Sequence, residues 1–298
     1  GVESGYAADD DGAKETHGGG NSFFSGCFDY NLDGIIDIII GNLFRDFDPE
    51  SRDRSAILTG STFKFPPKFI RSEIYQNEGS KSWSEGDHRG VFIDYNLDGL
   101  EDIIVENSGY PPDSRLTMFL QAEDHAYDDK AKDLGIDIVN PSGAVTIDLN
   151  HDGKMDFIVG QTDVRSHENE NRLYVFINQT PRENKNSIRF HLQGRTSNSL
   201  GISGSVFLKT NRNKYFRNVV YNYGSLPSQN EEGLYFAFNN ETLEDVTVNW
   251  PVGLTDRLGR ITPLVKTYSL KKVKMKGSHR EFNLCEDGRI LDHNKNCY

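Results

Sequence analysis

The stretch FDYNLDGIIDIIIGN, residues 28–42, places aspartates at positions 29, 33 and 37 of a short segment that also contains an asparagine and a glycine. The last aspartate runs directly into the apolar residues Ile38–Ile40. Like charges this close repel one another unless a cation lies between them. The stretch therefore predicts a cation-binding loop that leads into a buried strand.

The same pattern occurs twice more, as IDYNLDGLEDIIVEN from Ile93 and as IDLNHDGKMDFIVGQ from Ile147. The first aspartates of the copies are separated by 65 and 54 residues. Aspartate, asparagine and glycine also form ordinary turns, but three copies in register indicate a repeated structural unit. The shared positions are Asp29, Asn31, Asp33, Gly34 and Asp37; Asp94, Asn96, Asp98, Gly99 and Asp102; and Asp148, Asn150, Asp152, Gly153 and Asp156.

The spacing within each copy is typical of a calcium loop. Calcium takes six to eight oxygen ligands, and a loop supplies them from side chains at positions 1, 3 and 5 and from the carbonyl at position 7. Here position 9 adds a fourth side chain, and the glycine at position 6 permits the positive φ that turns the chain back. Position 12 is apolar, which argues against a helix-loop-helix hand. We therefore predict about three Ca²⁺ sites, with the shared Asp and Asn residues as side-chain ligands and Ile35, Leu100 and Lys154 as carbonyl ligands.

The segments around the loops predict an all-β protein. Short β-branched runs follow each loop, and units of this length fit four-stranded propeller blades. Beyond residue 184, segments such as SGSVFLKT, GLYFAFN and EDVTVNW are short, partly alternating and separated by Asn, Gly and Ser, as in a β-sandwich or barrel. We expect propeller blades over residues 1–183, a β domain over 184–276 and a short tail over 277–298.

Two family resemblances support this division. The repeats resemble the FG-GAP family, also called VCBS repeats, through the D-x-N-x-D-G-x-x-D core and the apolar strand after it. From about Ser187 the segments IRFHLQGRTSNSLGISGSVFLKT, YGSLPSQNEEGLYFAFNN and VTVNWPVGL resemble the ASPIC/UnbV domain, which follows such repeats in the cartilage acidic protein family. The resemblances imply calcium-loop propeller blades followed by a C-terminal β-sandwich-like ASPIC/UnbV domain. The residues that carry the second resemblance are Gly194, Ser197, Asn198, Gly201, Ser228, Gln229, Trp250, Pro251 and Gly253.

Three blades are too few to close a propeller, which has about four to eight. An open arc exposes a blade face at each end. Three explanations stay open: the chain is part of a longer protein, further degenerate blades are present, or neighbouring protomers cover the faces. The last would be a head-to-tail contact that builds rings or filaments.

The composition restricts the class of partner. A formal charge of −12 and a pI near 5.1 argue against binding to nucleic acid, which needs clustered Lys and Arg. No apolar run approaches the roughly 18 residues that span a bilayer. Because the sequence begins with Gly1 instead of Met, we expect a processed form.

The cysteines and two tripeptides indicate in which cellular or extracellular compartment the protein is found. Cys285 and Cys297 form either a disulfide, which indicates an oxidising compartment, or two free thiols, while Cys27 stands alone. Asn178 and Asn240 begin the tripeptides NQT and NET, which fit the N-glycosylation pattern but also arise by chance. We expect an extracellular, secreted or cell-surface glycoprotein.

The sequence holds no recognisable catalytic motif. It has no G-x-S-x-G, no G-x-x-x-x-G-K and no H-E-x-x-H, and His151 occupies a non-liganding position in the third loop. We therefore expect a non-catalytic, calcium-binding adhesion or interaction module with protein or glycan ligands. Two alternatives stay open: a structural protomer of a matrix or surface filament, and a non-catalytic appendage of a polysaccharide-active enzyme.

Overall fold

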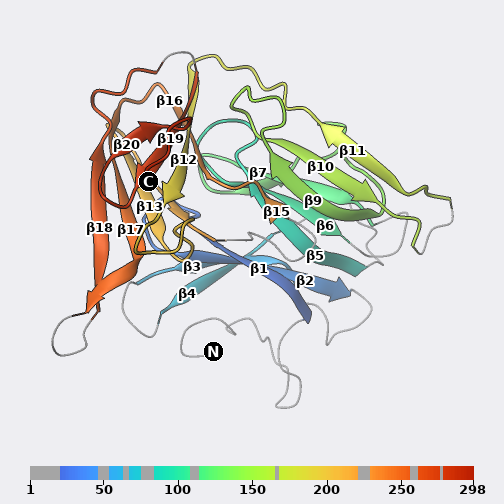
Figure 1. The fold of residues 1–298 in the computed structure, drawn as a ribbon. Helices are drawn as coiled ribbons and strands as arrows, with labels where there is room; N and C mark the ends of the chain where they lie inside the picture. The colour runs from blue at the N-terminus through green and yellow to red at the C-terminus, as the bar shows by residue number, and fades with distance from the viewer. Residues whose placement is uncertain are drawn as a thin grey trace.

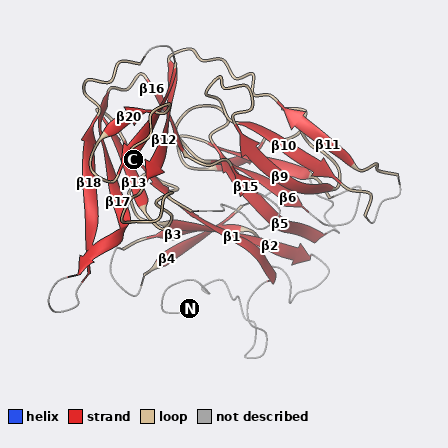
Figure 2. Cartoon of the chain, viewed as in Figure 1, coloured by secondary structure: helices blue, strands red, loops and turns tan. Residues whose placement is uncertain are grey.

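The computed structural model describes residues 21–45, 54–62, 67–74, 84–107, 114–164, 168–220, 229–255, 261–275 and 278–298. Within these ranges the chain forms twenty strands and no helix, which confirms the predicted all-β class (Figure 2). The described part accordingly offers no helical segment suited to crossing a membrane. The strands make four hydrogen-bonded sheets, and because the eight-stranded sheet contains two blades, they form the five blades of a β-propeller (Figure 1).

The first two blades are antiparallel meanders in which consecutive strands are neighbours. A short pairing of residues 43–45 with 84–86 joins them edge to edge. Blade 1 contains β1 (Asn21–Phe28), β2 (Asp37–Arg45), β3 (Ala56–Gly60) and β4 (Phe69–Glu73). Blade 2 contains β5 (Ser84–Ile93), β6 (Asp102–Asn107), β7 (Leu116–Gln121) and β8 (Tyr127–Asp129).

The third blade takes its fourth strand from the C-terminal half of the chain. It contains β9 (Pro141–Ile147), β10 (Asp156–Gln161) and β11 (Arg172–Phe176), and β15 (Gln229–Asn230) pairs parallel to β9. In addition, the Asn230 side chain donates to the Phe92 carbonyl oxygen of blade 2 at 2.6 Å. The C-terminal half of the chain therefore contacts both blade 2 and blade 3 directly.

The remaining two sheets pack against each other over one large hydrophobic core. Blade 4 has the order β16 (Leu234–Asn239), β12 (Lys185–Gln193), β19 (His279–Cys285) and β20 (Ile290–Asp292). Blade 5 has the order β14 (Lys214–Asn218), β13 (Ser205–Thr210), β17 (Leu243–Thr255) and β18 (Ile261–Ser269). Strand β14 contacts β1, so blade 5 adjoins blade 1.

This arrangement differs from the separate C-terminal sandwich expected from the sequence. Blades 4 and 5 do share a face-to-face core, as a sandwich would. However, the same part of the chain supplies β15 to blade 3 and contacts blade 1 through β14, so the structure does not set it apart as a second domain. The three sequence repeats are therefore three of five blades.

The segment expected to be a short tail is part of blade 4. Strand β19 lies between β12 and β20 and runs parallel to β12. Its alternate residues Phe282 and Leu284 are 5% and 0% exposed and belong to the core shared with blade 5. The alternation is short and flanked by charged residues, which is why the sequence pattern did not reveal it.

The blades bury both faces of their central strands. Ile103 and Val105 of β6 pack into the cluster between blades 1 and 2, whereas Ile104 packs into the cluster between blades 2 and 3. Alternate residues of a strand point to opposite faces, so the apolar triplet after the loop serves two cores at once. This confirms the expected buried strand.

We predict that Leu284→Ala lowers the free energy of unfolding by about 2–5 kcal/mol, because it removes a fully buried side chain from the core of blades 4 and 5. Val265→Ala on β18, whose side chain is 51% exposed, is the control and is expected to change it by about 0.5 kcal/mol or less. Urea denaturation measures both. Equal effects would mean that β19 is not part of the core.

Candidate metal-binding loops

Each predicted calcium loop joins the first two strands of the meander in its blade. Residues 29–36 lie between β1 and β2, residues 94–101 between β5 and β6, and residues 148–155 between β9 and β10. The structure therefore places the three copies at equivalent positions of three blades.

The first aspartate of each loop organises the backbone of its own turn. In the first loop, Asp29 Oδ1 accepts the N–H of Asp33 at 3.1 Å, and its Oδ2 accepts the N–H of Gly34 at 3.0 Å. Asp94 and Asp148 make the same pairs of bonds. All three first-position aspartates are 1–3% exposed, so their carboxylates are buried inside the turns.

The third and fifth positions contact each other. Asn31 Oδ1 accepts the N–H of Asp33 at 3.2 Å, its Nδ2 donates to Asp33 Oδ2 at 3.0 Å, and Asp33 Oδ1 accepts the N–H of Ile35 at 2.7 Å. The other two loops repeat these three contacts over distances of 2.8–3.3 Å. The side-chain oxygens of positions 1 and 3 are thereby brought together, because both accept the N–H of the residue at position 5.

The ninth-position aspartate ties the loop to the rest of the blade. Asp37 Oδ2 accepts the N–H of Tyr30 at 2.7 Å, and its Oδ1 accepts the N–H of Gly60, at the end of β3, at 2.6 Å. All three ninth-position aspartates are completely buried. In the second loop, Asp102 accepts the backbone N–H groups of Tyr95 and Gln121. In the third loop, Asp156 accepts those of Leu149 and Asn178.

The turns require positive φ at two positions, of which the sequence revealed one. Glycine fills position 6, with φ between 76° and 93°. Position 4 is also left-handed, with φ values of 57°, 61° and 57° at Leu32, Leu97 and His151. Leucine rarely adopts this conformation, so residue type gave no signal there.

Burial raises the pKa values of carboxylates in the first two loops. It raises the pKa of Asp29 to about 7, although the Gly34 N–H opposes the shift, and Asp37 and Asp33 raise the pKa further. It also raises the pKa of Asp37 to about 6. In the second loop, burial raises the pKa values of Asp94 and Asp102. A cation among these groups would favour the charged forms and reverse the shifts.

The donor set fits calcium. Every side chain at positions 1, 3, 5 and 9 offers an oxygen atom, the backbone is already folded around these atoms, and calcium prefers such hard oxygen ligands. The ligands would be the aspartates and asparagines named in the sequence, together with the carbonyl groups of Ile35, Leu100 and Lys154. Bound calcium would supply the positive charge that the buried carboxylates need.

In the third loop, two cationic side chains lie close to the carboxylates themselves. Lys154 Nζ lies 3.2 Å from Asp152 Oδ2, and its side chain is 12% exposed. Arg189 of β12 lies 3.8 Å from Asp148 Oδ2 and is 4% exposed. These charges compete with calcium, so we expect the third site to be the weakest of the three.

The second and third loops face blades 4 and 5. A Cβ atom on Gly99 would lie 2.7 Å from the Tyr215 ring, and one on Gly153 would lie 2.2 Å from the His279 ring. A Cβ atom on Gly34 would meet nothing within 4 Å. Leu32 of the first loop also packs against the core of blades 4 and 5, so all three turns are part of the contact between the repeats and the C-terminal sheets.

The two predicted glycosylation positions differ in accessibility. Asn178 is 1% exposed, and its Nδ2 donates to the carbonyl oxygens of Tyr95 at 2.8 Å and Met155 at 3.2 Å. A glycan on this nitrogen does not fit the folded chain, because neighbouring atoms fill the space around it, so the expectation at Asn178 is corrected. Asn240 is exposed and remains a predicted acceptor.

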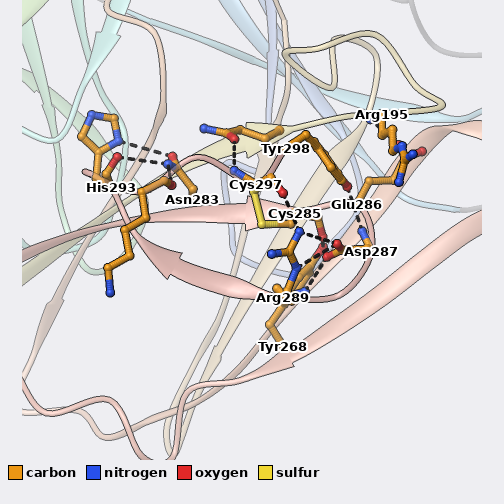
Figure 3. Close-up of a disulfide and its surroundings, with 12 residues drawn as sticks. Arg195, Tyr268, Asn283, Cys285, Glu286, Asp287, Arg289, His293, Cys297 and Tyr298 are labelled. Atoms are coloured by element: carbon orange, nitrogen blue, oxygen red, sulfur yellow. Dashed lines mark hydrogen bonds and ion pairs between the residues drawn. A yellow bond between two sulfur atoms is a disulfide. The ribbon is translucent and has the colours of Figure 1, made fainter.

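The structure pairs Cys285 with Cys297 in a disulfide (Figure 3). Nearby, Glu286 accepts hydrogen bonds from the backbone N–H groups of residues 195–197 and from the Ser197 hydroxyl. The disulfide thus lies where the end of β19 meets the loop after β12. Cys27 is a free, exposed cysteine.

Comparison with known protein families gives a match over part of the chain. Residues 94–159 match the sequence profile of the FG-GAP-like repeat. The match includes the second and third loops and covers less than half of the chain. A search of curated proteins found no match. The FG-GAP-like repeat and the five-bladed arrangement together support the propeller part of the sequence prediction.

We predict that Gly153→Ala destabilises the protein more than Gly34→Ala. Both substitutions place alanine at positive φ, which costs about 1–2 kcal/mol, but only alanine at 153 also collides with the His279 ring. Urea denaturation should show a further loss of at least about 1 kcal/mol for Gly153→Ala. Equal losses would contradict the packing of the third loop against β19.

We also predict that calcium stabilises the protein more strongly at pH 8 than at pH 5. Without metal, the raised pKa values of Asp29 and Asp37 mean that the folded state holds their protons more tightly than the unfolded state. This stability is complete below about pH 4 and is lost as the pH rises through about 6 to 7. Bound calcium would replace these protons as the positive charge beside the carboxylates, and it would thereby prevent the loss of stability at high pH.

Thermal unfolding at pH 5, 6, 7 and 8, with saturating calcium and after calcium removal, measures this difference. The gap between the two melting temperatures should widen with pH and should narrow in Asp29→Asn. A gap that stays constant from pH 5 to pH 8 would contradict the prediction.

Proposed function

We propose that this protein is a non-catalytic, calcium-binding interaction module of the extracellular space. The observation that carries the proposal is the repetition of one carboxylate geometry in three blades, with buried like charges in each. The FG-GAP-like match adds support, because such repeats are typical of extracellular or surface proteins. The disulfide fits an oxidising compartment.

Calcium has a structural role in this proposal. Its ligands at position 9 also hold the N–H groups of Gly60, Gln121 and Asn178, so the ion, the turn and the third strand stabilise one another. Extracellular calcium modules have dissociation constants of about 0.1–1 mM. At a few-fold excess of calcium, each site contributes roughly 1 kcal/mol. Three sites then matter against a total stability of about 5–15 kcal/mol.

The ligands of the module are proposed to be proteins or glycans of the extracellular space. Loops on a rigid sheet scaffold are the usual place for such binding, and ordered calcium turns would hold their neighbours in place. Residues 184–276 are proposed to correspond to an ASPIC/UnbV region, on the strength of the sequence resemblance and the core that blades 4 and 5 share.

The filament alternative has lost its main support. It was motivated by the exposed ends of a three-bladed arc, whereas blades 4 and 5 complete a five-bladed arrangement. Self-assembly and the role as an enzyme appendage remain untested predictions.

We predict that removal of calcium with a chelator lowers the melting temperature by several degrees at pH 7.5. Asp98→Asn should reduce this shift, because it removes one negative charge from the second loop while the side-chain oxygen can still accept the Leu100 N–H. Asp163→Asn, an exposed aspartate outside the loops, is the matched control and should leave the shift unchanged.

Calorimetric titration of calcium-free protein provides an independent readout. It should show about three sites in the wild type and one fewer, or one weaker, in Asp98→Asn. An unchanged melting curve with chelator, together with no heat of calcium binding, would contradict the proposed function.

A further inference from the structure

Three residues of blade 4 gather on one face of its sheet, and one of them, Glu281, also lies within 4.8 Å of Asp148, the first aspartate of the third loop. Glu281 lies on the central strand β19, His191 on β12 and His293 directly after β20. In the sheet register Arg189 is opposite Glu281, so His191 is two residues further along the same face. On the other side, the His293 N–H donates to the Glu281 carbonyl oxygen at 3.3 Å. The topology therefore brings two imidazoles to one carboxylate.

The ligating atoms of this cluster are close together. His191 Nε2 lies 3.4 Å from Glu281 Oε2, and His293 Nε2 lies 3.9 Å from the same oxygen. All three side chains offer an atom within 4.8 Å of the others. A tetrahedral zinc ion with bonds of about 2.0–2.2 Å separates its ligands by about 3.3 Å. Small side-chain rotations would bring the three atoms onto one ion.

We propose that His191, Glu281 and His293 form a binding site for a divalent transition-metal ion of the zinc class, which adjoins the third loop but has different ligands.

The hydrogen bonds of Asn283 fix the orientation of His293, as Figure 3 shows. Asn283 is 1% exposed, and its Nδ2 donates to the carbonyl oxygens of His293 at 3.1 Å and Lys295 at 2.9 Å. Its Oδ1, 3.3 Å from His293 Nδ1, is therefore an acceptor, and Nδ1 carries the proton. Neutral His293 then directs the lone pair of Nε2 toward Glu281. A ligating histidine commonly has its second nitrogen held in this way.

The two oxygens of Glu281 have different surroundings. Arg189 and His279 lie 3.8 and 3.3 Å from Oε1, whereas the two other histidines face Oε2. His191 Nε2 is buried and makes no hydrogen bond of good geometry. The carboxylate oxygen Oε2 thus faces two imidazole nitrogens, so one metal ion between them would contact all three side chains.

The ligand types separate this site from the calcium loops. Two imidazole nitrogens and one carboxylate suit zinc and related transition metals, whereas calcium selects oxygen ligands. Three protein ligands leave one position of a tetrahedral ion open. The His293 side chain is 50% exposed, so that position is accessible to water or to a ligand.

The test is a titration of tag-free, disulfide-intact protein with Zn²⁺ by calorimetry and with Co²⁺ by visible absorption. Calcium is kept at a saturating concentration so that the loops are occupied. We expect one equivalent to bind and the Co²⁺ complex to show the intense absorption of a tetrahedral site. His293→Gln should weaken binding at least about 10-fold, and His191→Gln should do the same. His88→Gln, which removes a histidine from β5 of blade 2, is the control and should bind like the wild type.

His293 is half-exposed, so its replacement should leave the fold intact, and far-UV circular dichroism checks this. Two results would overturn the proposal. One is equal zinc affinity in the wild type and His293→Gln. The other is the absence of Zn²⁺ and Co²⁺ binding by folded wild-type protein in calcium.

Discussion

The burial of like charges in the three turns is the constraint on which the blades depend. The first and ninth aspartates of every loop are at most 3% exposed, although carboxylates are costly to bury without a partner. Backbone N–H groups satisfy their hydrogen-bonding capacity but do not remove the net charge. The raised pKa values in the first two loops express the remaining cost, which a proton or a cation must offset.

This electrostatic constraint also affects how the loops pack against the strands of their own blades and against blades 4 and 5. The ninth aspartate of each loop holds the backbone at or just after the end of the third strand of its blade. The glycines of the second and third loops lie against Tyr215 and His279. Neither a larger residue at these glycines nor a splayed turn is compatible with blades 4 and 5 in their present positions. The conformation of these turns and the docking of the C-terminal sheets are therefore coupled.

Arg189 connects the third loop with the histidine cluster of blade 4. Its guanidinium lies 3.0 Å from Glu231, 3.8 Å from Asp148 and 3.8 Å from Glu281, and it is 4% exposed. One buried cation thus lies near a carboxylate of the third loop and near a carboxylate of the proposed transition-metal site. A change of charge at either place alters the electrostatic potential at the other, because interactions between buried charges are weakly screened.

The sequence by itself determined the loops and the strands after them, because spacing within nine residues and alternation along a strand are local properties. It did not reveal the left-handed conformation at Leu32 and Leu97, because leucine rarely adopts it. Nor did it reveal the burial of Asn178 or the strand β19, since both depend on neighbours distant in the chain. Tertiary structure decided that blades 4 and 5 join the three repeats, because that outcome rests on long-range pairing such as β15 with β9. It also brought His191 next to Glu281 and His293. His191 is distant from the other two in the chain, and the three are adjacent only because of the order of strands in one sheet.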